Sequence, residues 1–149
     1  MDKQSLSLRD KKILEFIRRH RISVLGISKS DGGVHSATLH YAHSEDSLNF
    51  LFITEKESRK CKSLLDSKDH SASLVIGFSE EEFVTLQMEG KIKIVTDKKE
   101  LEEVWKVYIG KYPQSIKRKS DSEFGILRFT PEYWSYRDYK TDPVTVISS

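Results

Sequence analysis

The sequence predicts a mainly β fold of the α+β class: an antiparallel barrel of about six strands with helices at its margins. The clearest observation is residues 84–94, where apolar and polar residues alternate as in a long half-buried strand. Neighbouring strand-like segments are also joined by short polar turns, which favours antiparallel pairing. Finally, most of these segments lack the helical crossover that a parallel sheet requires.

Size and composition favour one globular domain covering residues 1–149. The 149-residue chain is long enough for a hydrophobic core. A net charge of +2 is too small to imply a polyanionic partner, so we expect no nucleic-acid binding. The chain has one cysteine, no apolar run near the roughly 20 residues of a membrane helix, and no signal-peptide core at its N-terminus. These features predict a cytoplasmic protein without membrane contact.

The first third of the chain predicts a helix followed by three strands. We expect the N-terminal helix within residues 1–20, over residues 7–20, because apolar residues recur there at helical spacing. Residues 22–28 and 34–42 are the next two strands, joined by a Ser-Asp-Gly-Gly turn in which glycine supplies positive φ. Residues 48–54 form the third strand after a further polar turn.

The rest of the chain alternates between helices and strands. The expected elements are, in order, a short helix ending near residue 66, a buried strand 72–78, the long strand 84–94, a helix 97–110 with one apolar face, a polar basic loop 112–122 and a strand 124–130. We expect Pro131 to interrupt that last strand and residues 133–139 to continue it as an aromatic-rich edge. Residues 140–149 are expected to be a loose tail.

Residues 52–60, Phe-Ile-Thr-Glu-Lys-Glu-Ser-Arg-Lys, place two cations near the expected start of a helix. A helix N-terminus carries partial positive charge, so Arg59 and Lys60 are disfavoured there unless an anion binds. One interpretation is structural: Thr54 and Glu57 have capping-box spacing, so Thr54 starts the helix and the cations are solvated. The other is a phosphate site, since hydroxyls, arginine and lysine all donate to phosphate. The residues alone leave both open.

This stretch also resembles a known family. A strand ending in Ile53-Thr54, followed by four residues and Arg59-Lys60, resembles the pyridoxamine phosphate oxidase-like, FMN-binding split barrels. The order of elements over residues 10–95 resembles the same family. The resemblance implies a six-stranded antiparallel split β-barrel with flanking helices, and a homodimer with FMN bound at the subunit interface.

The resemblance assigns roles to particular residues. Arg59 and Lys60 would bind the FMN phosphate, with Ser58 assisting. Ile53 and Thr54 would touch the flavin or its ribityl chain through backbone and hydroxyl groups. The full set of implied cofactor-binding residues is Ser36, Ala37, Thr38, Leu39, Ile53, Thr54, Ser58, Arg59, Lys60, Thr85 and Gln87.

Three departures from the oxidases bear on the substrate. Residues 36–39 would present backbone groups to the flavin edge, but this strand lacks the Arg and Lys that open and close it in the oxidases. Thr85 stands where the oxidases carry Gln, and Gln87 on the same face could replace it. Residues 133–139 lack the oxidases' Arg-x-His-Asp-Arg type segment. We therefore do not expect pyridoxamine phosphate as the substrate.

Other conspicuous side chains have ordinary explanations. Trp134 and Arg137 could close over a flavin, but a half-buried edge strand or a dimer contact is favoured for them. His35 and His40 face opposite sides of a strand, so we predict no metal site. The cations at 117–119 precede acidic residues and are expected to be solvated.

These observations predict an FMN-dependent oxidoreductase that exchanges two electrons with a nicotinamide donor or a small-molecule substrate. The flavin supplies the redox chemistry, so no catalytic residue is named. A flavin-binding or stress protein without turnover and a haem-binding split barrel remain open alternatives. The residues do not separate FMN from a deazaflavin.

Overall fold

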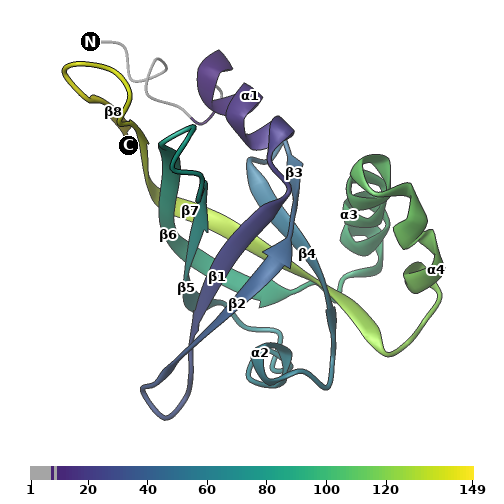
Figure 1. The fold of residues 1–149 in the computed structure, drawn as a ribbon. Coiled ribbons are helices and arrows are strands. Elements are labelled where there is room, and N and C mark those ends of the chain that lie inside the picture. Colours follow the sequence, from purple (N-terminus) through teal and green to yellow (C-terminus); the bar gives the residue numbers. More distant parts are fainter. Residues whose placement is uncertain (1–7, 9) are drawn as a thin grey trace.

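The structure is a computed structural model that describes residue 8 and residues 10–149. Its strands are β1 Ile22–Ser28, β2 Val34–His40, β3 Ala42–Ser44, β4 Asn49–Glu55, β5 His70–Ile76, β6 Val84–Ile94, β7 Phe124–Asp138 and β8 Thr145–Ser148. Its helices are α1 Lys11–Arg19, α2 Arg59–Lys62, α3 Lys98–Lys111, the 3-10 turn η2 Pro113–Ser115 and α4 Ile116–Lys119. The strands form one antiparallel sheet that curls into a half-open barrel with helices at its margins (Figure 1), which confirms the predicted fold class.

The strand order explains why the barrel stays split. The path runs β2-β1-β5-β6-β7-β4-β3, with β8 paired to β7. β2 pairs with β1 alone and lies beside β4 without pairing with it. Among the described residues, one edge of β2 therefore has no strand partner, and its backbone groups there remain available.

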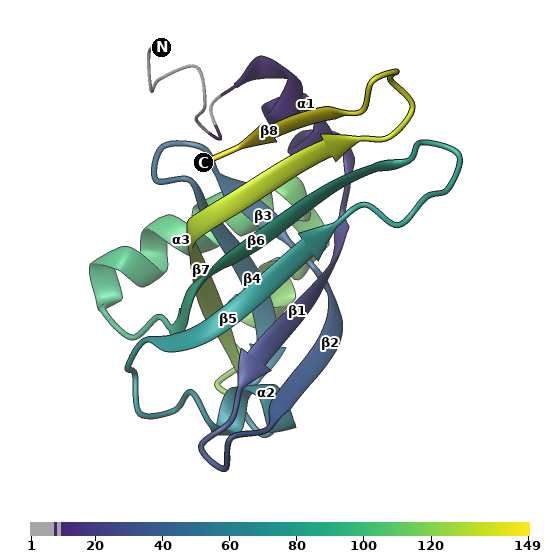
Figure 2. The ribbon, with the colours of Figure 1, turned by 90° about the vertical axis from the view of Figure 1, so that its left-hand side faces the viewer.

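Alternation along β6 separates the two faces of the sheet. Val84, Leu86 and Met88 are buried inside the barrel, whereas Thr85 and Gln87 lie on the outer face. Figure 2 shows this outer face as a broad surface made by β2, β1, β5, β6 and β7. The interior is filled by aromatic and aliphatic side chains from all sides, including Phe50, Phe52, Phe129 and Tyr136.

The two ends of the barrel are covered by different helices (Figure 1). α1 covers one end with Ile13, Phe16 and Ile17, which are fully buried. α2 covers the other end with Cys61, and Leu64 follows it into the same core. Burial raises the pKa of the Cys61 thiol, so it behaves as a core side chain.

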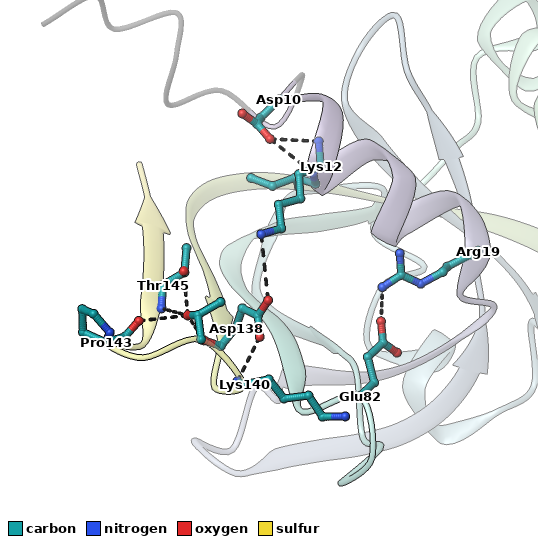
Figure 3. Close-up of polar contacts among 10 residues, drawn as sticks. Asp10, Lys12, Arg19, Glu82, Asp138, Lys140, Pro143 and Thr145 are labelled. Atoms are coloured by element: carbon teal, nitrogen blue, oxygen red, sulfur yellow. Dashed lines mark hydrogen bonds and ion pairs between the residues drawn. The ribbon is translucent and has the colours of Figure 1, made fainter.

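α1 begins one residue after Asp10, whose carboxylate accepts a hydrogen bond from the backbone N–H of Lys12 (3.0 Å). The expected helix start at residue 7 lies outside the described residues. Lys12 approaches Asp138 of β7 (3.9 Å), and Arg19 forms an ion pair with Glu82 of the β5–β6 loop (Figure 3). These pairs connect α1 to the end of β7 and to the β5–β6 loop.

α3 covers the outside of β3 and β4 and forms a second, smaller core. Its residues Val104, Trp105 and Tyr108 pack against Leu51 and Ile126 of the sheet. The Asp97 carboxylate caps the helix by accepting from the backbone N–H of Glu100 (2.9 Å). None of the helices in the described part of the chain has the length and apolar character of a membrane span.

Over the described residues the sheet has eight strands rather than six, for two reasons. The segment expected as one strand, 34–42, divides at Tyr41 into β2 and β3. Tyr41 turns inward, where its hydroxyl donates to the Ile17 carbonyl (2.7 Å). The second reason is that residues 140–149, expected to be a loose tail, contain β8, which pairs with β7 from Ser135↔Ser148 to Asp138↔Thr145. The loose-tail prediction is wrong because these residues complete the exposed edge of β7.

The expected interruption at Pro131 is also wrong, since β7 runs through it. A register shift in β6 between Glu89 and Gly90 lies opposite, and Gly90 pairs with Pro131. A Cβ at Gly90 would lie 2.1 Å from the Thr130 carbonyl oxygen, so only glycine permits this approach. The bulge lets strand pairing continue past Pro131, which has no backbone N–H to donate. It also lets β7 change its second neighbour from β4 to β8.

Candidate functional site

The turn between β4 and α2 is organised by Ser58. The Ser58 hydroxyl caps α2 by accepting from the backbone N–H of Cys61 (3.4 Å). Thr54 is still in β4, is 3% exposed, and its hydroxyl lies 3.1 Å from the Ser58 hydroxyl. The capping-box interpretation, in which Thr54 starts the helix, is therefore wrong, because residues 55–58 separate Thr54 from Arg59, the first helical residue.

Arg59 and Lys60 are the first two residues of α2. Among the described residues, no carboxylate forms an ion pair with either cation, whereas Lys62 on the same helix approaches Glu57 (3.7 Å). The backbone at the start of a helix carries partial positive charge, so it does not offset the charge of two cations there. An anion bound at this end of the barrel would supply the missing compensation.

The free edge of β2 lies next to this turn. α2 contacts β2 in the fold. Ser36 and Thr38 are exposed on the outer face, while Ala37 and Leu39 are partly buried. The structure therefore brings residues 36–39 to the same end of the barrel as Ser58, Arg59 and Lys60.

Thr85 and Gln87 are not part of this cluster within one chain. The pairing Thr38↔Val24, Val24↔Val75 and Val75↔Gln87 puts Gln87 on the same face as Thr38 but three strand spacings away. At about 4.8 Å per strand, the two lie about 14 Å apart across the sheet. The Thr85 hydroxyl also donates a hydrogen bond to the Ile76 carbonyl (3.4 Å).

Ile53 points away from the turn and toward α3. It is one of the residues around a hollow of about 320 Å³ beside the split between β2 and β4. The other lining residues include Arg21, His40, Tyr112 and Arg118. The Arg21 guanidinium lies over the Tyr112 ring (5.0 Å). No pattern in the sequence indicated this hollow, because its residues come from segments far apart in the chain.

A desolvated lysine lies behind the hollow. The Lys111 ammonium donates to the His20 carbonyl (2.8 Å) and lies 4.4 Å from the centre of the Tyr41 ring. Burial, with a smaller contribution from the charge of Arg21, lowers the pKa of Lys111 to about 8. Tyr112 donates its hydroxyl to the Tyr41 carbonyl (2.5 Å), which joins α3 to the end of β2.

The remaining sequence candidates lie in ordinary surroundings. Trp134 is 6% exposed and belongs to the barrel core, so it does not stack on a ligand outside. It is not on an edge strand, because β7 lies there between β6 and β8. Arg137 donates to the Ser135 hydroxyl (3.3 Å). Among the described residues, no group of three or more His, Cys, Asp or Glu side chains gathers as a metal site would require.

Comparison with known proteins supports the same fold. One solved structure, a conserved hypothetical protein of Mycobacterium tuberculosis, has a TM-score of 0.68 at 18% identity, covering 90% of this chain and 87% of that one. A second, from Clostridium acetobutylicum, is related to general stress protein 26 of the pyridoxinephosphate oxidase family. It gives a TM-score of 0.65 at 18% identity over 98% and 95% of the two chains.

A third solved structure, a heme binding protein of Mycobacterium smegmatis, has a TM-score of 0.69 at 11% identity. The match covers 91% of this chain but 56% of that one. No curated protein is similar enough in sequence to count as a match.

The family assignment comes from the sequence pattern over most of the chain. A sequence model described as pyridoxamine 5'-phosphate oxidase matches residues 10–138. That span includes the Arg59–Lys60 turn, the free edge of β2 and the whole barrel up to the end of β7. This chain therefore belongs to the pyridoxamine 5'-phosphate oxidase family.

Proposed function

We propose that this protein binds FMN and acts as an oxidoreductase on a substrate other than pyridoxamine phosphate. The observation that carries the proposal is the pair of unpaired cations, Arg59 and Lys60, beside the free edge of β2 in a chain of this family. A phosphate placed there would accept charge-assisted hydrogen bonds from both side chains.

The residues of the turn and of the neighbouring β2 edge can each be matched to one part of FMN. Arg59 and Lys60 would hold the phosphate, and the Ser58 hydroxyl lies next to them. The unpaired backbone groups along residues 36–39 would hydrogen-bond the polar edge of the flavin ring. FMN, when bound, supplies two-electron transfer, so the protein's task is to position the ring and exclude water.

The hollow beside Ile53 is our candidate for the substrate side of the site. It opens next to β2 and β4, the two strands expected to hold the flavin. Arg21 and Arg118 line it, and none of the described lining residues is a carboxylate. The charge of the hollow favours an anionic electron donor, such as a reduced nicotinamide nucleotide or a small acidic substrate.

A homodimer would complete the site, because Thr85 and Gln87 lie too far from β2 to act with it in one chain. The outer face that carries them has exposed apolar side chains: Val34 is 71% exposed, Tyr133 44% and Val146 52%. A second copy seated on this face would bury them. We expect light scattering to give a dimer mass, and Val34→Asp with Tyr133→Asp to give monomers. Ile116→Asp, on α4, is the matched control and should remain dimeric.

Haem is the second candidate ligand. One structural neighbour is a heme binding protein, and His40 is exposed at the mouth of the hollow. A neutral imidazole there is a suitable axial ligand. A Soret band on haem addition that His40→Ala abolishes would favour this candidate over a flavin.

The first experiment is a visible absorbance spectrum of the purified protein before and after FMN addition and desalting. Retained flavin bands support the proposal, and their absence would overturn it. Addition of NADH or NADPH then distinguishes an enzyme from a flavin-binding protein without turnover. In an enzyme, the flavin absorbance bleaches rapidly and recovers in air. A deazaflavin tested in parallel separates the two cofactors. The cytoplasmic location stays a prediction.

A further inference from the structure

A second hollow lies outside the proposed flavin and substrate sites. It has a volume of about 350 Å³ and lies between the α3–β6 side of the fold and the loop that leads from α4 to β7. Its apolar floor is made by Ile94, Leu101, Trp105 and Phe124. A volume of this size is within the range, about 300–1,000 Å³, of pockets that hold small molecules.

One polar group of this hollow, the Trp105 indole, lacks a partner among the described residues. Trp105 is 3% exposed, and no described residue accepts a hydrogen bond from its indole N–H. Trp105 is one of the residues that line the hollow. A buried tryptophan N–H usually finds an acceptor. A ligand oxygen in the hollow would provide one.

The charge of the rim favours an anion. Lys56 lines the hollow, and no described carboxylate forms an ion pair with it. Lys119 is held by Glu102 (3.2 Å). The one carboxylate in the lining, Asp121, is engaged by the backbone N–H of Glu123 (2.9 Å). Lys56 is thus the free charge among the described lining residues.

We propose that this hollow binds a small organic anion with an aromatic or aliphatic body. The body packs on Leu101 and Phe124, the Trp105 indole donates to one oxygen of the anionic group, and Lys56 balances its charge. This inference does not depend on the flavin proposal, because none of the predicted flavin residues lines the hollow.

The test uses naphthoate as the probe and the two tryptophans as reporters. In an isotope-labelled sample of the full chain, we expect the Trp105 indole N–H signal to shift on titration and to saturate with a Kd of about 1 mM or tighter. The Trp134 signal, from the barrel core, should stay fixed. Trp105→Phe assigns the two signals and keeps the apolar floor.

Three comparisons make the result decisive. Lys56→Met should weaken naphthoate binding about tenfold or more, because hydrogen bonds to charged groups are the strong ones. Lys106→Met, an exposed lysine of α3 outside the hollow, is the matched control and should bind as the native chain does. Uncharged naphthalene methanol should bind at least about tenfold more weakly. A fixed Trp105 signal, or binding that is lost in Arg59→Ala with Lys60→Ala but kept in Lys56→Met, would overturn the proposal.

Discussion

The two candidate sites beside β4 are built differently. At the α2 end, Thr54, Ser58, Arg59 and Lys60 come from one short stretch, and the cations project from the start of a helix. On the α3 side, the hollow beside Ile53 is lined by residues of the α1–β1 loop, β2, β4, the C-terminal part of α3, η2 and α4, and its cations lie over aromatic rings. The comparison shows that a candidate binding motif can lie in one short stretch of sequence, while the surface next to it is formed by residues that are far apart in the chain.

The largest effect that this comparison predicts is on cofactor affinity. Arg59→Ala with Lys60→Ala should weaken FMN binding about 100-fold or more, since each hydrogen bond to a charged group is worth about 1.5–3 kcal/mol. Fluorescence titration with FMN measures it. Lys62→Ala, which removes a paired cation of the same helix, is the control. Unchanged affinity in the double variant would remove the phosphate site, and unfolding without FMN should change little.

The second prediction asks whether the two sites are distinct. Arg21→Ala with Arg118→Ala should lower kcat/KM for flavin reduction by NADPH about tenfold, while FMN affinity stays within about threefold of native. Stopped-flow reduction and FMN titration measure the two quantities. If FMN affinity falls as far as in the Arg59 and Lys60 variant, the two regions are one site.

The third prediction concerns how the α3 side is held together. Tyr112→Phe removes the hydroxyl that donates to the Tyr41 carbonyl (2.5 Å) and leaves the ring under Arg21. We expect a loss of about 1 kcal/mol in the free energy of unfolding. Denaturant unfolding measures it, and Tyr133→Phe on the outer face provides the comparison. Equal stability of the two variants would mean that this hydrogen bond does not fix α3.

The last expected effect, of similar size, is a pH dependence of stability that comes from Lys111. Burial lowers its folded pKa to about 8 from the ordinary lysine value of 10.5, so between these values the unfolded chain binds more protons. Stability should therefore rise with pH over this window. In Lys111→Met the free energy of unfolding should no longer rise with pH. The rise lost is about 1 kcal/mol, which allows for the partial exposure of Lys111. Unfolding at about pH 7 and about pH 9.5 tests it, with Lys106→Met as control. Parallel pH profiles would show that Lys111 is not desolvated.

Most of the sheet was predictable because the pattern that defines it is local. The alternation in β6 follows from one buried and one exposed face, and the turn before β2 follows from glycine at Gly32, whose φ is +87°. The errors arose where a distant partner decided the outcome. β8 exists because β7 offers it an edge, and β7 passes Pro131 because Gly90 lies opposite.

The candidate site divides in the same way. Arg59 and Lys60 were found because residues adjacent in sequence stay adjacent at a turn. The sequence could not show that Ser58 rather than Thr54 caps α2. Arg21 and Arg118 were missed, since no spacing in the sequence connects residues that are almost a hundred positions apart.

The sequence by itself determined the alternating strands, the amphipathic helices and the Arg59–Lys60 turn, since each depends on the chemistry of neighbouring residues. Tertiary structure alone decided which edge of β2 stays free, that Gln87 lies about 14 Å from Thr38, and that a hollow forms beside Ile53 of β4. These features depend on strand order, and strand order is set by burial of the whole core rather than by any one segment.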